Sequence, residues 1–236
     1  MWIIMRTKFL FFVFVFSVFC LSLVIANPNG AEVTLGDSSR GSSSDVGNDT
    51  NAYAGNVTEL NLYSDSVTSK WQGYYGNVSG VIKLANSNDD VMYNWSLAAP
   101  TGQVYAANSS SVTWSSIDCF NMAADVGDLE DFYNINSDAS DGVDETFSEQ
   151  SHPAFNTAGE AFAEDQCYSV SLFNNAGVGT FTQVLLADGG VRPVFTSIIS
   201  DDTEGFDGNL WDFQMIVLED GTDETASTYY FWVEIN

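Results

Sequence analysis

The chain has 236 residues, 45% of them hydrophobic, which is enough for one large folded domain or two small ones. Its 32 acidic residues outnumber six basic ones, and the formal net charge of −26 excludes nucleic acids and anionic lipid surfaces as partners. The charge is uneven, because residues 27–117 hold eight acids and three bases, whereas residues 118–236 hold 24 acids and one base.

Residues 1–26 have the pattern of a signal peptide. Arg6 and Lys8 precede an apolar run from Phe9 to Ala26, which ends in small residues that fit cleavage after Ala26. We therefore predict export through the Sec pathway to an extracellular or cell-surface location. The alternative is a retained membrane anchor, since the run approaches the roughly 20 residues that span a bilayer.

Residues 27–55 are mostly Gly, Ser, Asn and Asp and predict a flexible N-terminal segment. One short stretch has strand character. A lone strand cannot satisfy its own backbone groups, so we expect it to pair with its own domain or with a neighbouring subunit. The predicted assembly strand consists of Ala31, Glu32, Val33, Thr34, Leu35 and Gly36.

Residues 56–236 predict one all-β domain, an antiparallel β-sandwich of about ten strands. Short segments rich in β-branched and aromatic residues recur between turn-forming clusters, from "VTELNLYS" at 57–64 to "TYYFWVEIN" at 228–236, which we place inside a sheet. Ile82 and Leu84, and again Tyr93 and Trp95, alternate with polar residues. This alternation predicts one buried face and one wet face.

Five Asn-X-Ser/Thr sequons lie in the nearly neutral half of the chain. In an exported protein this clustering predicts N-glycosylation at two or more of them. The sequon asparagines are Asn48, Asn56, Asn77, Asn94 and Asn108.

The stretch "KWQGYYGNVSG" at 70–80 offers Trp71, Tyr74 and Tyr75 as residues that could stack on sugar rings or on a partner. Neighbouring residues of a strand point to opposite faces, so Tyr74 and Tyr75 cannot share one platform. We favour a structural role, with Trp71 and one tyrosine in the core. Ligand stacking is the alternative.

Cys20 lies in the signal segment, so Cys119 and Cys167 remain and predict a disulfide. In the chain-entropy model this bridge stabilises the fold by about 4 kcal/mol. It closes residues 120–166, the least strand-like part of the chain, where we expect one or two short helices, for example around "FNTAGEAFAED" at 155–165.

Calcium is the one cofactor that the sequence suggests, because clustered carboxylates and turn carbonyls hold hard cations. The alternative is a solvated anionic surface of the kind found in saline habitats. The first candidate ligands are Asp201, Asp202, Glu204 and Asp207.

No motif supports catalysis. His152 is the only histidine and is expected to be a solvated loop residue. With 32 acids, carboxylate pairs at the spacing of a glycosidase arise by chance.

Four blocks resemble secreted archaeal surface proteins of unassigned function: "AGNVTELNLY" at 54–63, "WQGYYGNVSGVIKL" at 71–84, "YNWSLAAPTGQVYA" at 93–106 and "VTWSSIDC" at 112–119. The resemblance implies an exported, glycosylated archaeal surface protein. In architecture the chain is also similar to archaeal extracellular filament subunits and TasA-like fibre proteins, which implies donated strands between subunits.

The leading hypothesis is therefore a non-enzymatic structural protein that forms filaments or matrix from its own copies or with other surface proteins or glycans. The alternatives are a calcium-dependent carbohydrate- or surface-binding module and a secreted glycosidase.

Overall fold

The structure is a computed structural model that describes residues 27–42, 47, 49–189, 192–220 and 226–235. The predicted signal peptide and the sequon at Asn48 lie outside the described residues. Antiparallel strands make up most of the regular structure and helices are few, as the sequence predicts. None of the helices in the described ranges is long and apolar enough to cross a membrane.

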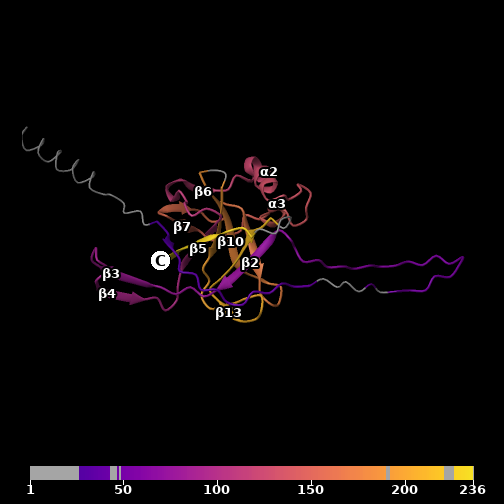
Figure 1. The fold of residues 1–236 in the computed structure, drawn as a ribbon, viewed down its shortest axis with the longest axis horizontal. Coiled ribbons are helices and arrows are strands. Elements are labelled where there is room, and N and C mark those ends of the chain that lie inside the picture. The colour runs from indigo at the N-terminus through magenta and orange to yellow at the C-terminus, as the bar shows by residue number, and fades with distance from the viewer. Residues whose placement is uncertain (1–26, 43–46, 48, 190–191, 221–225, 236) are drawn as a thin grey trace, which may run out of the picture.

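The largest sheet has seven strands and forms the centre of the molecule (Figure 1). The strands pair in the order β1, β15, β5, β11, β10 and β6, and β9 pairs with β10. Because β15 lies between β1 and β5, the prediction that the last strand lies inside a sheet is confirmed. The bounds are β1 Asn29–Gly30, β15 Tyr230–Ile235, β5 Gly102–Ala107, β11 Arg192–Ile198, β10 Gly179–Asp188, β6 Ile117–Cys119 and β9 Ser169–Phe173.

This sheet is covered on both faces. Val104 and Ala106 of β5 belong to one buried cluster, whereas Tyr105 and Ala107 belong to the other, as the two-residue repeat of a strand requires. All six residues of β5 are buried for this reason.

A second sheet, β2 (Trp71–Gly76) with β14 (Phe213–Leu218), packs on the first face. The buried side chain of Gln183 in β10 joins the sheets, because it donates to the Ile216 carbonyl and accepts from the Ile216 N–H, both at 2.7 Å. The Ser197 hydroxyl of β11 donates to the Gln214 carbonyl at 2.8 Å. Side chains of the large sheet thus satisfy backbone groups of β14 that β2 does not reach.

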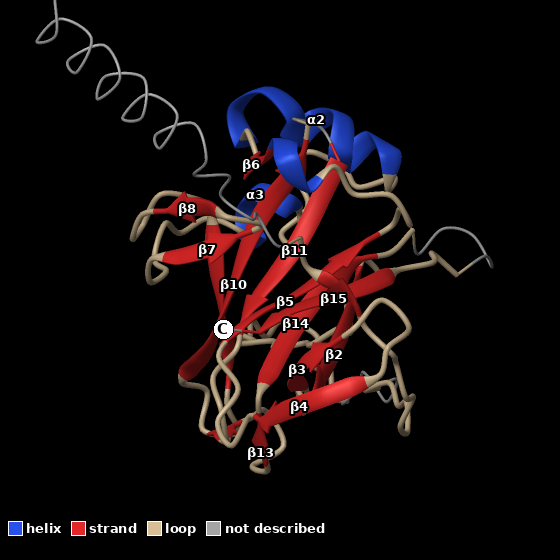
Figure 2. Cartoon of the chain, turned by 90° about the vertical axis from the view of Figure 1, so that its left-hand side faces the viewer, coloured by secondary structure: helices blue, strands red, loops and turns tan. Residues whose placement is uncertain are grey.

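The region between the two cysteines contains helices, but not where the sequence placed one. The helices are α2 (Met122–Phe132) and α3 (Val143–Thr146), which gather at one end of the large sheet (Figure 2). The helix expected around residues 155–165 is wrong, since this stretch forms the hairpin of β7 (Phe155–Thr157) and β8 (Glu160–Phe162). Its two turn residues both have positive φ, which fits the two-residue hairpin turn.

Two parts of the chain project from this body at opposite ends (Figure 1). One is the hairpin of β3 (Val81–Ala85) and β4 (Val91–Ser96). The other is an extended arm, described over residues 37–42, 47 and 49–69, which turns back at Tyr53–Asn56, where Gly55 has φ +89°. The strand predicted over residues 57–64 is wrong, because these residues pair with no strand in the described chain. Every described residue from 37 to 67 is exposed.

Three short elements complete the fold. They are the 3-10 helix η1 (Trp114–Ser116) and the paired strands β12 (Thr203–Glu204) and β13 (Leu210–Trp211).

Candidate functional sites

The disulfide is confirmed between Cys119 of β6 and Cys167 in the loop before β9. Beside it lies His152, whose Nε2 accepts the Cys167 N–H at 2.8 Å and whose Nδ1 donates to the Pro153 carbonyl at 2.9 Å. The expectation of a solvated histidine is wrong, because the ring is buried and packs on Phe155. Since both ring nitrogens bind backbone groups, His152 fixes the loop and offers no free nitrogen for proton transfer.

The three rings of the "WQGYYG" strand have separate environments. Trp71 packs against Phe147 and Phe195, and its Nε1 donates to the Asp141 carbonyl at 2.8 Å. Tyr74 lies edge-on to Phe231. Both rings therefore join the core, whereas Tyr75 points to the opposite face and stays 43% exposed.

Tyr75 belongs to a surface cluster with Phe206 and Trp211. Its ring centroid lies 4.8 Å from that of Phe206 and 5.0 Å from that of Trp211, both in edge-on geometry. These centroid distances leave no slot between the rings, because they are contact distances for aromatic pairs. A ligand would have to lie on the outer surface of the cluster.

None of the four acids predicted to bind calcium at 201–207 belongs to a converging group of carboxylates in the described part of the chain. Asp207 accepts the Trp211 indole N–H at 2.9 Å and the backbone and side-chain N–H groups of Asn209, and these bonds lower the pKa of its carboxyl. Desolvation, followed by the charges of Asp202 and Asp212, raises the pKa of Asp201. The calcium site at Asp201, Asp202, Glu204 and Asp207 stays a prediction.

A different group of acids does converge. Among the described residues, Glu130, Asp144 and Glu145 place carboxylate oxygens within 4.8 Å of one another. Glu130 is buried and accepts the Val143 N–H at 2.8 Å, at the start of α3, and burial raises the pKa of its carboxyl. The protonated Glu145 carboxyl donates a hydrogen bond to Asp144, which raises the pKa of Glu145. This is a donor set that suits a hard cation.

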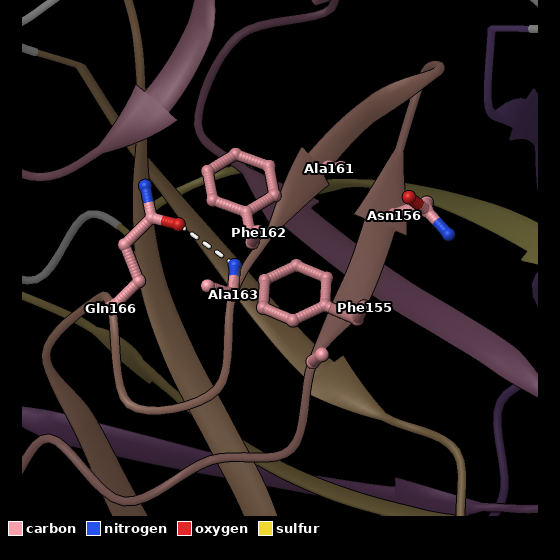
Figure 3. A pocket seen from close by; sticks show the side chains of 7 residues that line it. Phe155, Asn156, Ala161, Phe162, Ala163 and Gln166 are labelled. Carbon is pink, nitrogen blue, oxygen red and sulfur yellow. Dashed lines mark hydrogen bonds between the residues drawn. The ribbon is translucent and has the colours of Figure 1, made fainter.

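The β7–β8 hairpin borders a shallow hollow of about 400 Å³ (Figure 3). Its most apolar part is the stacked pair Phe155 and Phe162, with centroids 4.9 Å apart, and Gln166 closes one side by accepting the Ala163 N–H. Both phenylalanine rings are largely buried, and the lining holds few polar side chains, namely Asn156 and Gln166. The hollow therefore offers few of the polar groups that orient a ligand.

The described sequons differ in accessibility. Asn56 on the arm, Asn77 after β2 and Asn94 on β4 are exposed. Asn108 is half-buried, and its Nδ2 donates to the Tyr133 hydroxyl at 3.1 Å. Four sequons that look alike in sequence thus differ in the accessibility of the asparagine that a glycan would modify.

The predicted assembly strand begins as part of the body and then leaves it. Asn29 and Gly30 pair with β15, and the Ala31 N–H donates to the Phe231 carbonyl at 3.0 Å. Residues 32–36 are exposed and have no strand partner in the described chain. Donation of this strand to a neighbour stays a prediction.

The β3–β4 hairpin is the feature that sequence reasoning misjudged most. Its register places Ile82 opposite Trp95 and Leu84 opposite Tyr93, so the four side chains share one face. The alternation predicted that this face is buried, yet all four residues are exposed. The pattern predicted which residues share a face, but not that none of the described residues covers that face.

The chain matches no protein-family model, no curated protein and no solved structure.

Proposed function

We propose that this protein is a non-enzymatic structural protein of the archaeal cell surface, which is exported with a cleaved signal peptide and assembles into extracellular filaments or matrix by adding strands between copies. The observation that carries the proposal is the pair of projections from a well-packed body. Both expose apolar residues, and both have backbone groups that no strand of the described chain pairs.

The exposed apolar residues are too many and too clustered to be incidental. On the arm they are Tyr53, Val57, Leu60, Leu62, Tyr63 and Val67, and on the hairpin Val81, Ile82, Leu84, Val91, Met92, Tyr93 and Trp95. Clustered apolar surface of this kind is characteristic of interaction sites. Open strand edges and extended segments are the elements that β-augmentation joins.

The body supports a scaffold role. Two packed sheets fit the β-sandwich interpretation, and the disulfide is compatible with an oxidising, extracellular environment. The described residues bring no nucleophile, base and orienting group together, since the single histidine is committed to backbone bonds.

Electron microscopy and sedimentation of the exported protein test the proposal. We expect filaments or higher oligomers that grow with protein concentration. A chain that stays monomeric at every concentration, with and without calcium, would overturn it.

A second candidate, a calcium-dependent carbohydrate- or surface-binding module, is favoured by the exposed Tyr75, Phe206 and Trp211 cluster beside acidic loops. The matched test is glycan-array binding of Tyr75→Ala against Tyr74→Phe. Binding lost only in Tyr75→Ala, and in chelator, would support this function over assembly.

A further inference from the structure

The β3–β4 hairpin has one face of four large apolar side chains and an opposite, mainly polar face, on which Lys83 and Asn94 lie beside Val81. Ile82, Leu84, Tyr93 and Trp95 form the face that we call the apolar hairpin face. The Tyr93 and Trp95 rings contact each other edge-on, with centroids 4.9 Å apart, which confirms that they share a side.

The opposite face carries groups that need water. Lys83 lies opposite Asn94 in the register and forms an ion pair with Asp89 at 2.7 Å. Asn94 is a sequon asparagine, and a glycan there would cover this polar face and leave the apolar hairpin face open. A two-stranded ribbon with one open apolar face is not stable alone in water.

A matching element lies at the other end of the molecule. The return limb of the arm, residues 57–67, is extended and exposed, with Leu60 and Leu62 on one side of an extended chain. Long connections without secondary structure are uncommon in compact domains and are usually either functional segments or linkers. Its residues 57–63 are long enough to run alongside a strand of five or six residues.

Charge favours contact at these two places. The C-terminal half of the chain, which forms most of the body, carries 24 acids and one base, so bodies repel each other. The return limb carries only Glu59 and Asp65, and the hairpin carries Lys83 with Asp89 and Asp90. Two copies can therefore meet at limb and hairpin with little like-charge repulsion.

We propose that the return limb of one copy docks on the β3–β4 hairpin of a second copy, with Leu60 and Leu62 against the apolar hairpin face. Because the two elements lie at opposite ends of the molecule, the contact is head to tail and each added copy exposes a new hairpin or a new limb (Figure 1). Such a heterologous contact builds open chains instead of closed dimers. This inference rests on the proposed self-assembly and names its two surfaces.

The experiment places one lysine on each surface of the exported protein. Tyr93→Lys charges the apolar hairpin face, and Leu62→Lys charges the limb. The matched controls, Val81→Lys and Asn61→Lys, add the same charge on the opposite face of the hairpin and on the opposite side of the limb. All four positions are exposed, so each variant should keep the near-UV circular dichroism and melting temperature of the wild type.

We expect wild type and both controls to form long assemblies in sedimentation velocity, whereas Tyr93→Lys and Leu62→Lys are monomers. An equimolar mixture of the two monomeric variants should give a one-to-one dimer that grows no further. In that dimer the intact limb of Tyr93→Lys sits on the intact hairpin of Leu62→Lys, and both free ends are defective.

Three outcomes would overturn the inference. Closed dimers of Leu62→Lys would mean that hairpins pair with each other, and assembly by both defective variants would place the contact elsewhere, while the proposed function survives in both cases. A wild type that is monomeric under all conditions would overturn the proposed function together with the inference.

Discussion

The body and the two projections follow opposite rules, although both are built from strand-forming sequence. In the body, every strand of the large sheet finds partners, and residues of β5 and β10 are buried on both faces. In the hairpin and the arm, similar residues remain exposed. The difference shows that alternation predicts which residues share a face, whereas burial depends on whether the chain itself supplies a covering layer.

The largest difference should come from the disulfide, which stabilises only the body. Cys119→Ser with Cys167→Ser opens a loop with a sequence separation of 48 residues. We expect a loss of about 4 kcal/mol in the free energy of unfolding by chain entropy. Urea unfolding of the double variant measures it. A loss below about 1 kcal/mol would mean that the helical region folds against the sheet without the bridge.

A matched pair of ring deletions tests the comparison directly. Phe195 in the body is fully buried and contacts Trp71, Phe147 and Tyr229, so Phe195→Ala should cost about 3 kcal/mol or more through the cavity it leaves. Tyr93 on the hairpin is 59% exposed, so Tyr93→Ala should change the unfolding free energy of the monomer by less than about 0.5 kcal/mol. Comparable losses would show that the apolar hairpin face is covered within the monomer.

The sequence predicted the body well because local pattern and global burial agree there. Strands β10, β11 and β15 combine β-branched and aromatic residues with turn signals, and the two cysteines that follow the predicted signal peptide allow one pairing. It failed where local pattern does not determine the partner. The burial of His152 depends on loops that meet only in the folded chain, and the apolar hairpin face is open because no described part of the chain covers it.

The pKa of a carboxyl is shifted in opposite directions in the body and on the hairpin, so the pH dependence of stability should differ between the two regions. Burial raises the pKa of Glu130 in the body, whereas the hydrogen bond from Lys83, followed by its charge, lowers the pKa of Asp89 on the hairpin. With a folded-state pKa above the unfolded value of about 4.3, Glu130 binds more protons in the native state, so its contribution to stability falls as pH rises through that interval.

Glu130→Gln keeps the acceptor for the Val143 N–H and removes this titration. We expect thermal melts of the variant to gain less stability than the wild type on acidification from neutral pH. Asp89→Asn is the control, because a carboxyl with a lowered pKa loses its contribution as pH falls and is screened by solvent. Parallel pH curves for wild type and Glu130→Gln would contradict the burial of this charge.

The smallest expected change in stability comes from two sequons that are equivalent in sequence but differ in their surroundings. The Nδ2 of Asn108 in the body donates to the Tyr133 hydroxyl, which bonds at 2.9 Å to the Tyr229 hydroxyl, and Tyr229 donates to the Leu218 carbonyl at 2.8 Å. A glycan needs this same nitrogen, so it would compete with a half-buried hydrogen-bond chain. Asn94 on the hairpin is exposed, so a glycan there would compete with no such buried hydrogen-bond chain.

Glycopeptide mass spectrometry of the exported protein should therefore find Asn94 occupied and Asn108 largely free. Asn108→Gln should lower the unfolding free energy by about 1 kcal/mol through the lost hydrogen bond. Asn94→Gln should stay within about 0.5 kcal/mol, because it alters only the exposed polar face of the hairpin. Full occupancy at Asn108 with an unchanged melting temperature would mean that the tyrosine chain does not depend on its amide. The side chain of Asn108 would then belong to the exposed surface, and the buried core would begin at Tyr133.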